Sequence, residues 1–214
     1  MQPAQHGTDA LVPAPSTGYR PRLALISAIA MALAACSSNI SVPLKGQFPE
    51  PIVGALPLSM GILYQDELRT FRHEEPDSRL KVELGPPNVK LFDQIFSKMF
   101  EQAVPVTTQQ PGPGFDAVVE PMIETFEYLE PAISGSEFYA VTIRYRISVY
   151  DPSGGVIASW SLVAYGKSRS RALNSGQSLG EATLRAMRDA AAILSTEFKD
   201  QKQVKAWLLA RNTQ

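Results

Sequence analysis

The chain has 214 residues, and its 20 lysines and arginines nearly balance its 21 aspartates and glutamates, so net charge gives no reason to expect a nucleic-acid partner. Hydrophobic residues make up 44% of the sequence and charged residues 19%, which is typical of a globular protein and not of a disordered chain. One cysteine and two histidines exclude an internal disulfide and a zinc site made of cysteine and histidine alone.

The N-terminal region has the pattern of a cleavable export signal. Arg20 and Arg22 precede an uncharged run of 13 residues from Leu23 to Ala35. A helix of this length covers about 20 Å, less than the roughly 30 Å hydrocarbon core of a bilayer, so a permanent membrane span is not expected. Pro21 separates the two arginines, which favours the general secretory route over twin-arginine export. We therefore expect residues 1–35 to be removed as a signal peptide.

The end of this run carries the most specific motif in the chain, Leu33-Ala34-Ala35-Cys36. The motif resembles the lipobox of bacterial lipoproteins. That resemblance implies that signal peptidase recognises Leu33, Ala34 and Ala35. It also implies that Cys36 becomes the first residue of the mature chain, with a diacylglycerol on its sulfur and a further acyl chain such as palmitate on its amino group. Two or more acyl chains hold a protein firmly on a membrane, whereas one chain is marginal.

The residues after Cys36 bear on the destination of the protein and on the spacing of its domain. In lipoproteins an aspartate directly after the cysteine tends to retain the protein at the inner membrane, and here that residue is Ser37. The resemblance therefore implies the outer membrane of a Gram-negative cell, with the folded domain facing the periplasm. Residues 36–50 contain two prolines and a glycine without an apolar period, so they predict a flexible tether that spans about 20 Å.

The first elements of the folded part are two strands and a helix. A strand is expected over 52–60, at a sheet edge because of Pro57, and a short strand is expected over 80–84. A helix is expected over 88–103, with Asn88 as its N-cap. Its apolar stripe consists of Phe92, Ile95, Phe96, Met99 and Ala103.

Period-two patterns predict three further strands. Over 115–128 alternate residues are apolar, and Pro121 indicates an edge or a bulge. Over 138–150 the alternation is the clearest in the sequence, and residues 151–155 supply turn chemistry. A return strand is expected over 156–167. Its predicted buried face consists of Val156, Ala158, Trp160 and Leu162. The last two strands therefore predict a β-hairpin.

The C-terminal part predicts a helix and a tail. The helix is expected over 178–199, opened by a capping box from Ser178 to Glu181, with small side chains that allow close approach to a sheet. Its apolar stripe consists of Leu184, Met187, Ala191, Leu194 and Phe198. Residues 201–214 have apolar residues at helical spacing and either dock back or reach a partner. For residues 51–200 we predict an α+β two-layer sandwich, in which a mainly antiparallel sheet of four to five strands carries two helices on one face.

Candidate catalytic groups do not form a coherent set. The G-x-S-x-G motif of serine hydrolases matches residues 176–180, but the preceding stretch is polar and no histidine follows Ser178. His73 lies among charged residues without the spacing of a metal site. Glycoside chemistry needs paired carboxylates, and the candidates lie on or just after a predicted surface strand: Glu120, Glu124, Glu127 and Glu130. We expect no enzymatic activity, with a hydrolase that uses Ser178 as an alternative.

Two groups of residues are candidates for binding. Lys167, Arg169 and Arg171 alternate with serines and either meet phosphates or an acidic surface, or lie in a solvated loop. An acyl chain or another apolar ligand could lie between the helices and the sheet. The residues that would line such a site, and that more often form a plain core, are Phe92, Phe96, Met99 and Trp160. No cofactor and no metal is indicated.

The leading hypothesis is a membrane-anchored, non-enzymatic accessory or assembly component in envelope transport or surface biogenesis, and the carrier is the alternative. The expected partners are the membrane, through the lipid anchor, and an envelope protein. No nucleic acid or small-molecule substrate is indicated. Predicted contact points are Trp207 in the tail and Arg144 and Arg146, which lie opposite acidic residues of the preceding strand if the two strands pair antiparallel.

Overall fold

The computed structural model describes residues 40–41, 44, 48, 54–74, 80–171 and 174–211. The chain divides into two units, Met1–Ser38 and Asn39–Gln214, and all described residues belong to the second unit. The predicted signal peptide and Cys36 therefore lie outside the described residues.

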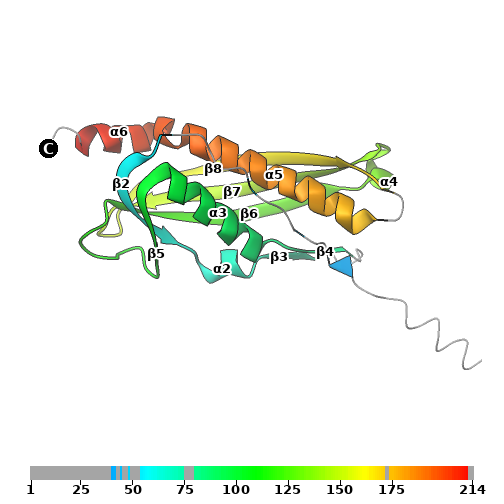
Figure 1. Ribbon diagram of the computed structural model, residues 1–214, viewed down its shortest axis with the longest axis horizontal. Helices are drawn as coiled ribbons and strands as arrows, with labels where there is room; N and C mark the ends of the chain where they lie inside the picture. Colours follow the sequence, from blue (N-terminus) through cyan, green and yellow to red (C-terminus); the bar gives the residue numbers. More distant parts are fainter. Residues whose placement is uncertain are drawn as a thin grey trace, which may run out of the picture. The chain divides into compact units, whose positions relative to one another are not determined.

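The main sheet has five strands in the order β5-β2-β6-β7-β8. Their bounds are Leu56–Leu63 for β2, Phe100–Val106 for β5, Ala117–Leu129 for β6, Phe138–Tyr150 for β7 and Val156–Arg169 for β8. The two long ladders, β6–β7 and β7–β8, are antiparallel, whereas β2 pairs in parallel with β5 and β6. Helices α3 (Gly85–Met99) and α5 (Ser175–Glu197) pack on this sheet (Figure 1). The predicted α+β fold is confirmed.

The predicted hairpin is present. Alternate side chains of β7 from Tyr139 to Val149 are buried, and the turn to β8 contains Gly154 with a φ of 90°. The Asp151 carboxylate accepts hydrogen bonds from the backbone N–H groups of Ser153 and Gly155, which fixes the turn. Val156 is exposed, contrary to prediction. The ladder shifts its register between Val149 and Tyr150, so the alternation of β8 holds only beyond that point.

The predictions made from the two strand prolines, Pro121 and Pro57, have different outcomes. β6 pairs with β2 only over residues 117–119, so from Pro121 onward β7 is its only ladder partner among the described residues. The ladder also shifts its register between Ile123 and Thr125, which confirms the predicted edge or bulge. The edge prediction from Pro57 is wrong, since β2 is an inner strand. Pro57 instead lies within a register shift, where a missing N–H is tolerated.

A smaller sheet of order β1-β4-β3 adjoins the main one. Its strands are β1 (Ile40–Ser41), β4 (Leu80–Glu83) and β3 (Arg72–Glu74), and helix α2 (Asp66–Arg69) precedes β3. The strand predicted over 80–84 is confirmed, whereas β3 and α2 had not been predicted. Phe48 is buried in the core and Leu44 packs against it. At the described positions between 40 and 48 the chain therefore belongs to the folded domain, in contrast to the flexible tether expected there.

Helix α3 begins before Asn88, so the predicted N-cap is wrong. Pro86 and Pro87 lie in the first turn, where a missing N–H costs nothing, and Asn88 is fully buried inside the helix. The Asn88 side chain donates to the carbonyl of Leu84 at 2.8 Å and accepts from the Tyr145 hydroxyl at 2.7 Å. The helix ends at Met99, so Ala103, predicted to be helical, lies in β5. Asn88 therefore does not cap the helix but binds Tyr145 of β7.

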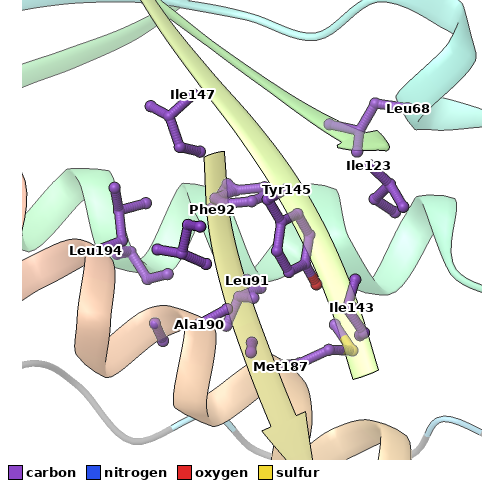
Figure 2. Packing of buried hydrophobic residues seen from close by; sticks show 14 of the residues in the cluster. Leu68, Leu91, Phe92, Ile123, Ile143, Tyr145, Ile147, Met187, Ala190 and Leu194 are labelled. Atoms are coloured by element: carbon purple, nitrogen blue, oxygen red, sulfur yellow. The ribbon is translucent and has the colours of Figure 1, made fainter. Parts of the chain in front are cut away.

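Helix α5 also begins earlier than predicted, which makes the Ser178 capping box wrong. Ser178 lies one turn inside the helix, where its hydroxyl accepts the backbone N–H of Arg171 at 3.2 Å. Glu181 accepts the Ser168 hydroxyl at 2.9 Å instead of folding back on the helix end. The predicted apolar stripe of this helix is confirmed, since all five of its residues are buried, and Figure 2 includes Met187 and Leu194 from it.

Small residues bring α5 into backbone contact with β8. A Cβ atom placed on Gly166 would lie 2.2 Å from the carbonyl oxygen of Ala182 and 2.3 Å from the nitrogen of Ala186. The predicted close approach of helix and sheet is therefore present. Two side chains of α5 also reach the edge of the sheet. Asp189 accepts the backbone N–H of Tyr165 at 2.9 Å, and Arg185 donates to the carbonyl of Lys167 at 2.7 Å.

The C-terminal tail docks back onto the domain. A 3-10 turn, η1 (Phe198–Asp200), joins α5 to helix α6 (Lys202–Arg211), and Val204 of α6 is fully buried. Arg211 forms an ion pair with Asp116 at 2.7 Å, next to the start of β6. Residues 212–214 lie outside the described residues.

Replacing Gly166 by alanine tests the contact between α5 and β8. We expect Gly166→Ala to lower the free energy of unfolding by about 1–3 kcal/mol, because the added methyl group meets helix backbone that cannot rotate away. The measurement is urea denaturation followed by circular dichroism. Gly54→Ala is the control, since no atom lies within 4 Å of a Cβ placed there. Equal midpoints for the two variants would contradict the contact.

Candidate functional site

The face of the main sheet away from α3 and α5 carries a polar cluster that joins three strands. The predicted antiparallel pairing of β6 and β7 is confirmed, but the residues directly opposite the two arginines are not acidic: Thr125 lies opposite Arg144 and Met122 lies opposite Arg146. Arg146 forms an ion pair with Glu124. Arg144 is exposed and contributes to the electrostatic field at Glu124. The cluster stabilises the register of the sheet, and Arg144 is among its exposed residues.

The electrostatics of Glu124 argue against the catalytic role considered for the acidic residues. The Ser161 hydroxyl donates to Glu124 at 2.9 Å and, together with Arg146, lowers the pKa of this carboxyl group. A catalytic acid of a glycoside hydrolase needs a raised pKa. Glu120 accepts a hydrogen bond from the amide of Gln109 at 3.0 Å, while Glu127 and Glu130 lie further along the chain at the end of β6. The four carboxylates are thus spread along one strand and its end.

The arrangement around Ser178 differs from that of a nucleophile elbow. The motif requires a strand, a tight turn and then a helix, but residues 176–180 all lie inside α5. Ser178 is only 1% exposed, and its hydroxyl is engaged by the backbone of Arg171. The serine therefore helps to fix the segment that enters the helix.

His73 lies in β3 and takes part in aromatic packing. Its ring centroid lies 5.0 Å from that of Phe126 and 5.7 Å from that of Tyr128, which brings the small sheet against the end of β6. The neighbouring Glu74 pairs with Lys81 at 3.0 Å. Among the described residues, no group of three or more histidine, cysteine or acidic side chains is placed to hold a metal ion.

The residues considered as a carrier lining pack on one another. The ring centroids of Phe92 and Phe96 lie 5.6 Å apart in a stacked pair. Phe92 also meets the Tyr145 ring edge to face, with centroids 5.7 Å apart, and Figure 2 labels both of these residues. The ring centroids of Trp160 and Phe198 lie 5.9 Å apart. A cavity of about 510 Å³ is lined by Met99 alone of the residues predicted for a carrier site, and its other described walls come from the start of β2, the end of α5 and η1. These aromatic rings thus form core packing between the helices and the sheet.

The basic residues at the end of β8 make contacts within the domain. Arg169 pairs with Glu137 at 2.7 Å and Arg171 pairs with Glu181 at 3.3 Å. The Lys167 ammonium lies 5.2 Å from the centroid of the Phe138 ring. These contacts favour a structural role for the cations at this end of the sheet.

Trp207 is half-buried against the core, and the guanidinium of Arg211 lies 5.6 Å from the centroid of its ring. Its use as a contact for a partner protein stays a prediction.

The end of the β6–β7 hairpin carries exposed apolar side chains that had not been singled out from the sequence. Leu129 at the end of β6 is 53% exposed, Ile133 in helix α4 (Pro131–Ser134) is 77% exposed and Phe138 at the start of β7 is 38% exposed. We call these three residues the apolar tip. The available signal was an isoleucine within a turn of proline, glycine and serine residues, where apolar side chains are unusual.

The predicted anchor residues Leu33, Ala34, Ala35 and Cys36 lie outside the described residues. In the part of the chain that the structure describes, no helix combines the length and the apolar character needed to cross a membrane.

No family model and no curated protein matches the chain. Among solved structures, it resembles a Xanthomonas campestris protein of family DUF330, with 14% identity and a TM-score of 0.49 over 77% of this chain and 97% of the other. It also resembles the rare lipoprotein B of Shewanella oneidensis, with 12% identity and a TM-score of 0.42 over 69% of this chain and 98% of the other. A lipoprotein of Neisseria meningitidis has 13% identity and a TM-score of 0.34 over 56% and 91% of the two chains. Similarities this low carry no inference about function.

A fluorophosphonate probe tests the hydrolase alternative. We expect the folded protein and its Ser178→Ala variant to give the same background labelling, because the Ser178 hydroxyl is buried and His73, the histidine among the described residues, packs against Phe126. Labelling is read by in-gel fluorescence, with a known serine hydrolase in the same sample as a positive control. A signal that the wild type gives and Ser178→Ala removes would restore the hydrolase.

Proposed function

We propose that the mature protein is a lipoprotein held by Cys36 at the periplasmic face of the outer membrane, and that it acts as a non-enzymatic accessory or assembly component in envelope transport or surface biogenesis. The observation that carries this proposal is the sequence Leu33-Ala34-Ala35-Cys36 at the end of an uncharged run. Only a cysteine in this place provides the thiol that accepts a diacylglycerol, and the chain has no other cysteine.

The fate of the candidate catalytic groups supports a binding role over an enzymatic one. Ser178 is buried, the pKa of Glu124 is lowered, and the ring of His73 packs against Phe126. A partner could bind the face of the sheet away from α3 and α5, around the exposed Arg144, together with α6 around Trp207. An envelope protein is the partner that the proposed location makes available.

Cys36→Ser tests the anchor. We expect the variant to incorporate no labelled palmitate, to retain its signal peptide and so to migrate as a larger species, and to leave the outer-membrane fraction, since serine cannot form the thioether. Metabolic labelling, electrophoresis and membrane fractionation give the three readings. Ser38→Ala is the matched control and should behave as the wild type. Unchanged labelling and fractionation in Cys36→Ser would remove the assignment of both anchor and compartment.

The same variant tests the envelope role in cells. If the protein serves the outer membrane, then deleting its gene should raise permeability to a large antibiotic, and wild type but not Cys36→Ser should restore the barrier. Restoration by a Cys36→Ser protein that carries no lipid would contradict a role that requires the anchor.

Ser37→Asp tests the destination. We expect this change to move the lipidated protein from the outer to the inner membrane, because an aspartate directly after the lipidated cysteine tends to retain lipoproteins there. Sucrose-density separation of the two membranes measures the shift. Asn39→Asp adds the same charge two residues later and should leave the distribution unchanged. An outer-membrane location for Ser37→Asp would show that the chain is not sorted by this rule.

A further inference from the structure

We propose that the apolar tip of Leu129, Ile133 and Phe138 inserts into the phospholipid surface on which Cys36 is anchored. This inference rests on the proposed lipidation of Cys36 and adds a second contact with the membrane, made by the folded domain itself. Three observations carry it: the exposure of the tip, the place where the chain enters the fold, and the small size of the apolar surface.

The tip exposes apolar side chains at one end of the sheet. Leu129 and Phe138 lie close together on the paired strands β6 and β7. Leu129 is opposite Ala140, and Phe138 comes two residues before Ala140 on the same strand. Ile133 lies in the short helix that connects the two strands. All three are exposed. The charged neighbours Arg169 and Glu137 pair with each other, and the Lys167 ammonium lies over the Phe138 ring. A lysine beside an apolar side chain at a membrane surface can keep its charge among the headgroups.

The chain enters the fold at the same end. Three residues separate Cys36 from Ile40 of β1, so covalent geometry limits the distance between their Cα atoms to about 14 Å. β1 pairs with β4 and β4 with β3, which places β3 about 10 Å from β1. His73 of β3 contacts Tyr128, the residue before Leu129. Figure 1 shows β1, the unlabelled blue arrow, at the same end of the domain as α4, and α6 at the other end.

The size of the tip favours lipid over a protein partner. Each side of a stable protein complex buries about 800 Å², which three partly exposed side chains do not supply. A membrane contact needs less, because an acyl anchor already holds the domain at the surface and a second, weaker signal fixes its orientation. A bilayer that holds Cys36 is thus the surface that this tip can reach and enter.

The test measures the depth of the tip in a bilayer. The full-length protein is produced with Ser134→Cys, purified with its lipid and labelled at position 134 with an environment-sensitive fluorophore, because Cys36 is blocked by its thioether. It is reconstituted into vesicles of phosphatidylethanolamine and phosphatidylglycerol with or without spin-labelled quencher lipids. Ser153→Cys, in the β7–β8 turn, is the matched control. We expect quenching at position 134 and none at position 153.

Substitutions at exposed apolar positions then test the side chains. Ile133→Asp should abolish the quenching at position 134, whereas Val156→Asp, at another exposed apolar residue at the start of β8, should leave it unchanged. Neither side chain is buried, so both variants should keep the circular dichroism of the parent. Equal quenching at positions 134 and 153, or quenching that persists in Ile133→Asp, would overturn the proposal.

Mass spectrometry of the N-terminal peptide separates this inference from the function on which it rests. Acylated Cys36 with an unquenched probe at position 134 overturns the membrane contact alone. Unacylated Cys36 overturns the lipoprotein assignment and the membrane contact with it. A blue shift at position 134 that depends on protein concentration and not on quencher lipids would replace the bilayer by a second copy of the chain.

Discussion

The backbone contact between β8 and α5 at Gly166 determines how this helix, the longest among the described residues, lies on the sheet. Because no side chain separates the two elements there, α5 is close enough for Asp189 and Arg185 to bind backbone groups at the outer edge of β8. The same close packing lets Glu181 accept the Ser168 hydroxyl beside the entry to the helix. One small residue thus permits both core packing and the covering of part of an edge strand that would otherwise be free to pair with another chain.

The buried pair of Asn88 and Tyr145 has a corresponding role for α3. The Tyr145 hydroxyl is fully enclosed, and burial raises its pKa, so it stays protonated and donates to Asn88. A buried hydroxyl without such a partner would be costly, so the pair specifies one position of α3 over β7. The two helices are therefore positioned by different means, α5 by the absence of a side chain and α3 by a hydrogen bond.

The elements that the sequence predicts best are those with long, regular patterns. The alternation over 138–150 and the apolar stripe of α5 were sufficient to predict a strand and a helix there, because all the apolar residues of each pattern lie on one buried face. The helix starts were misplaced where a polar residue suited to capping has a tertiary partner, as Asn88 has in Tyr145 and Ser178 has in Arg171. Strand β5 was missed because it follows α3 without any turn residue. Of the candidate site, the pairing of Arg146 with Glu124 was predictable, whereas the apolar tip emerges only when the hairpin is assembled.

The order of strands has a consequence for the way the domain forms. β2 is the first strand of the main sheet in the chain, yet it lies between β5 and β6, both of which come later. A polypeptide that emerges with its N-terminus first cannot complete the pairing of β2 until residue 119 has followed. β2 is therefore without its β6 neighbour until the 56 residues from Tyr64 to Val119 have been made, so the assembly of the sheet depends on a pairing between segments that lie far apart in the chain.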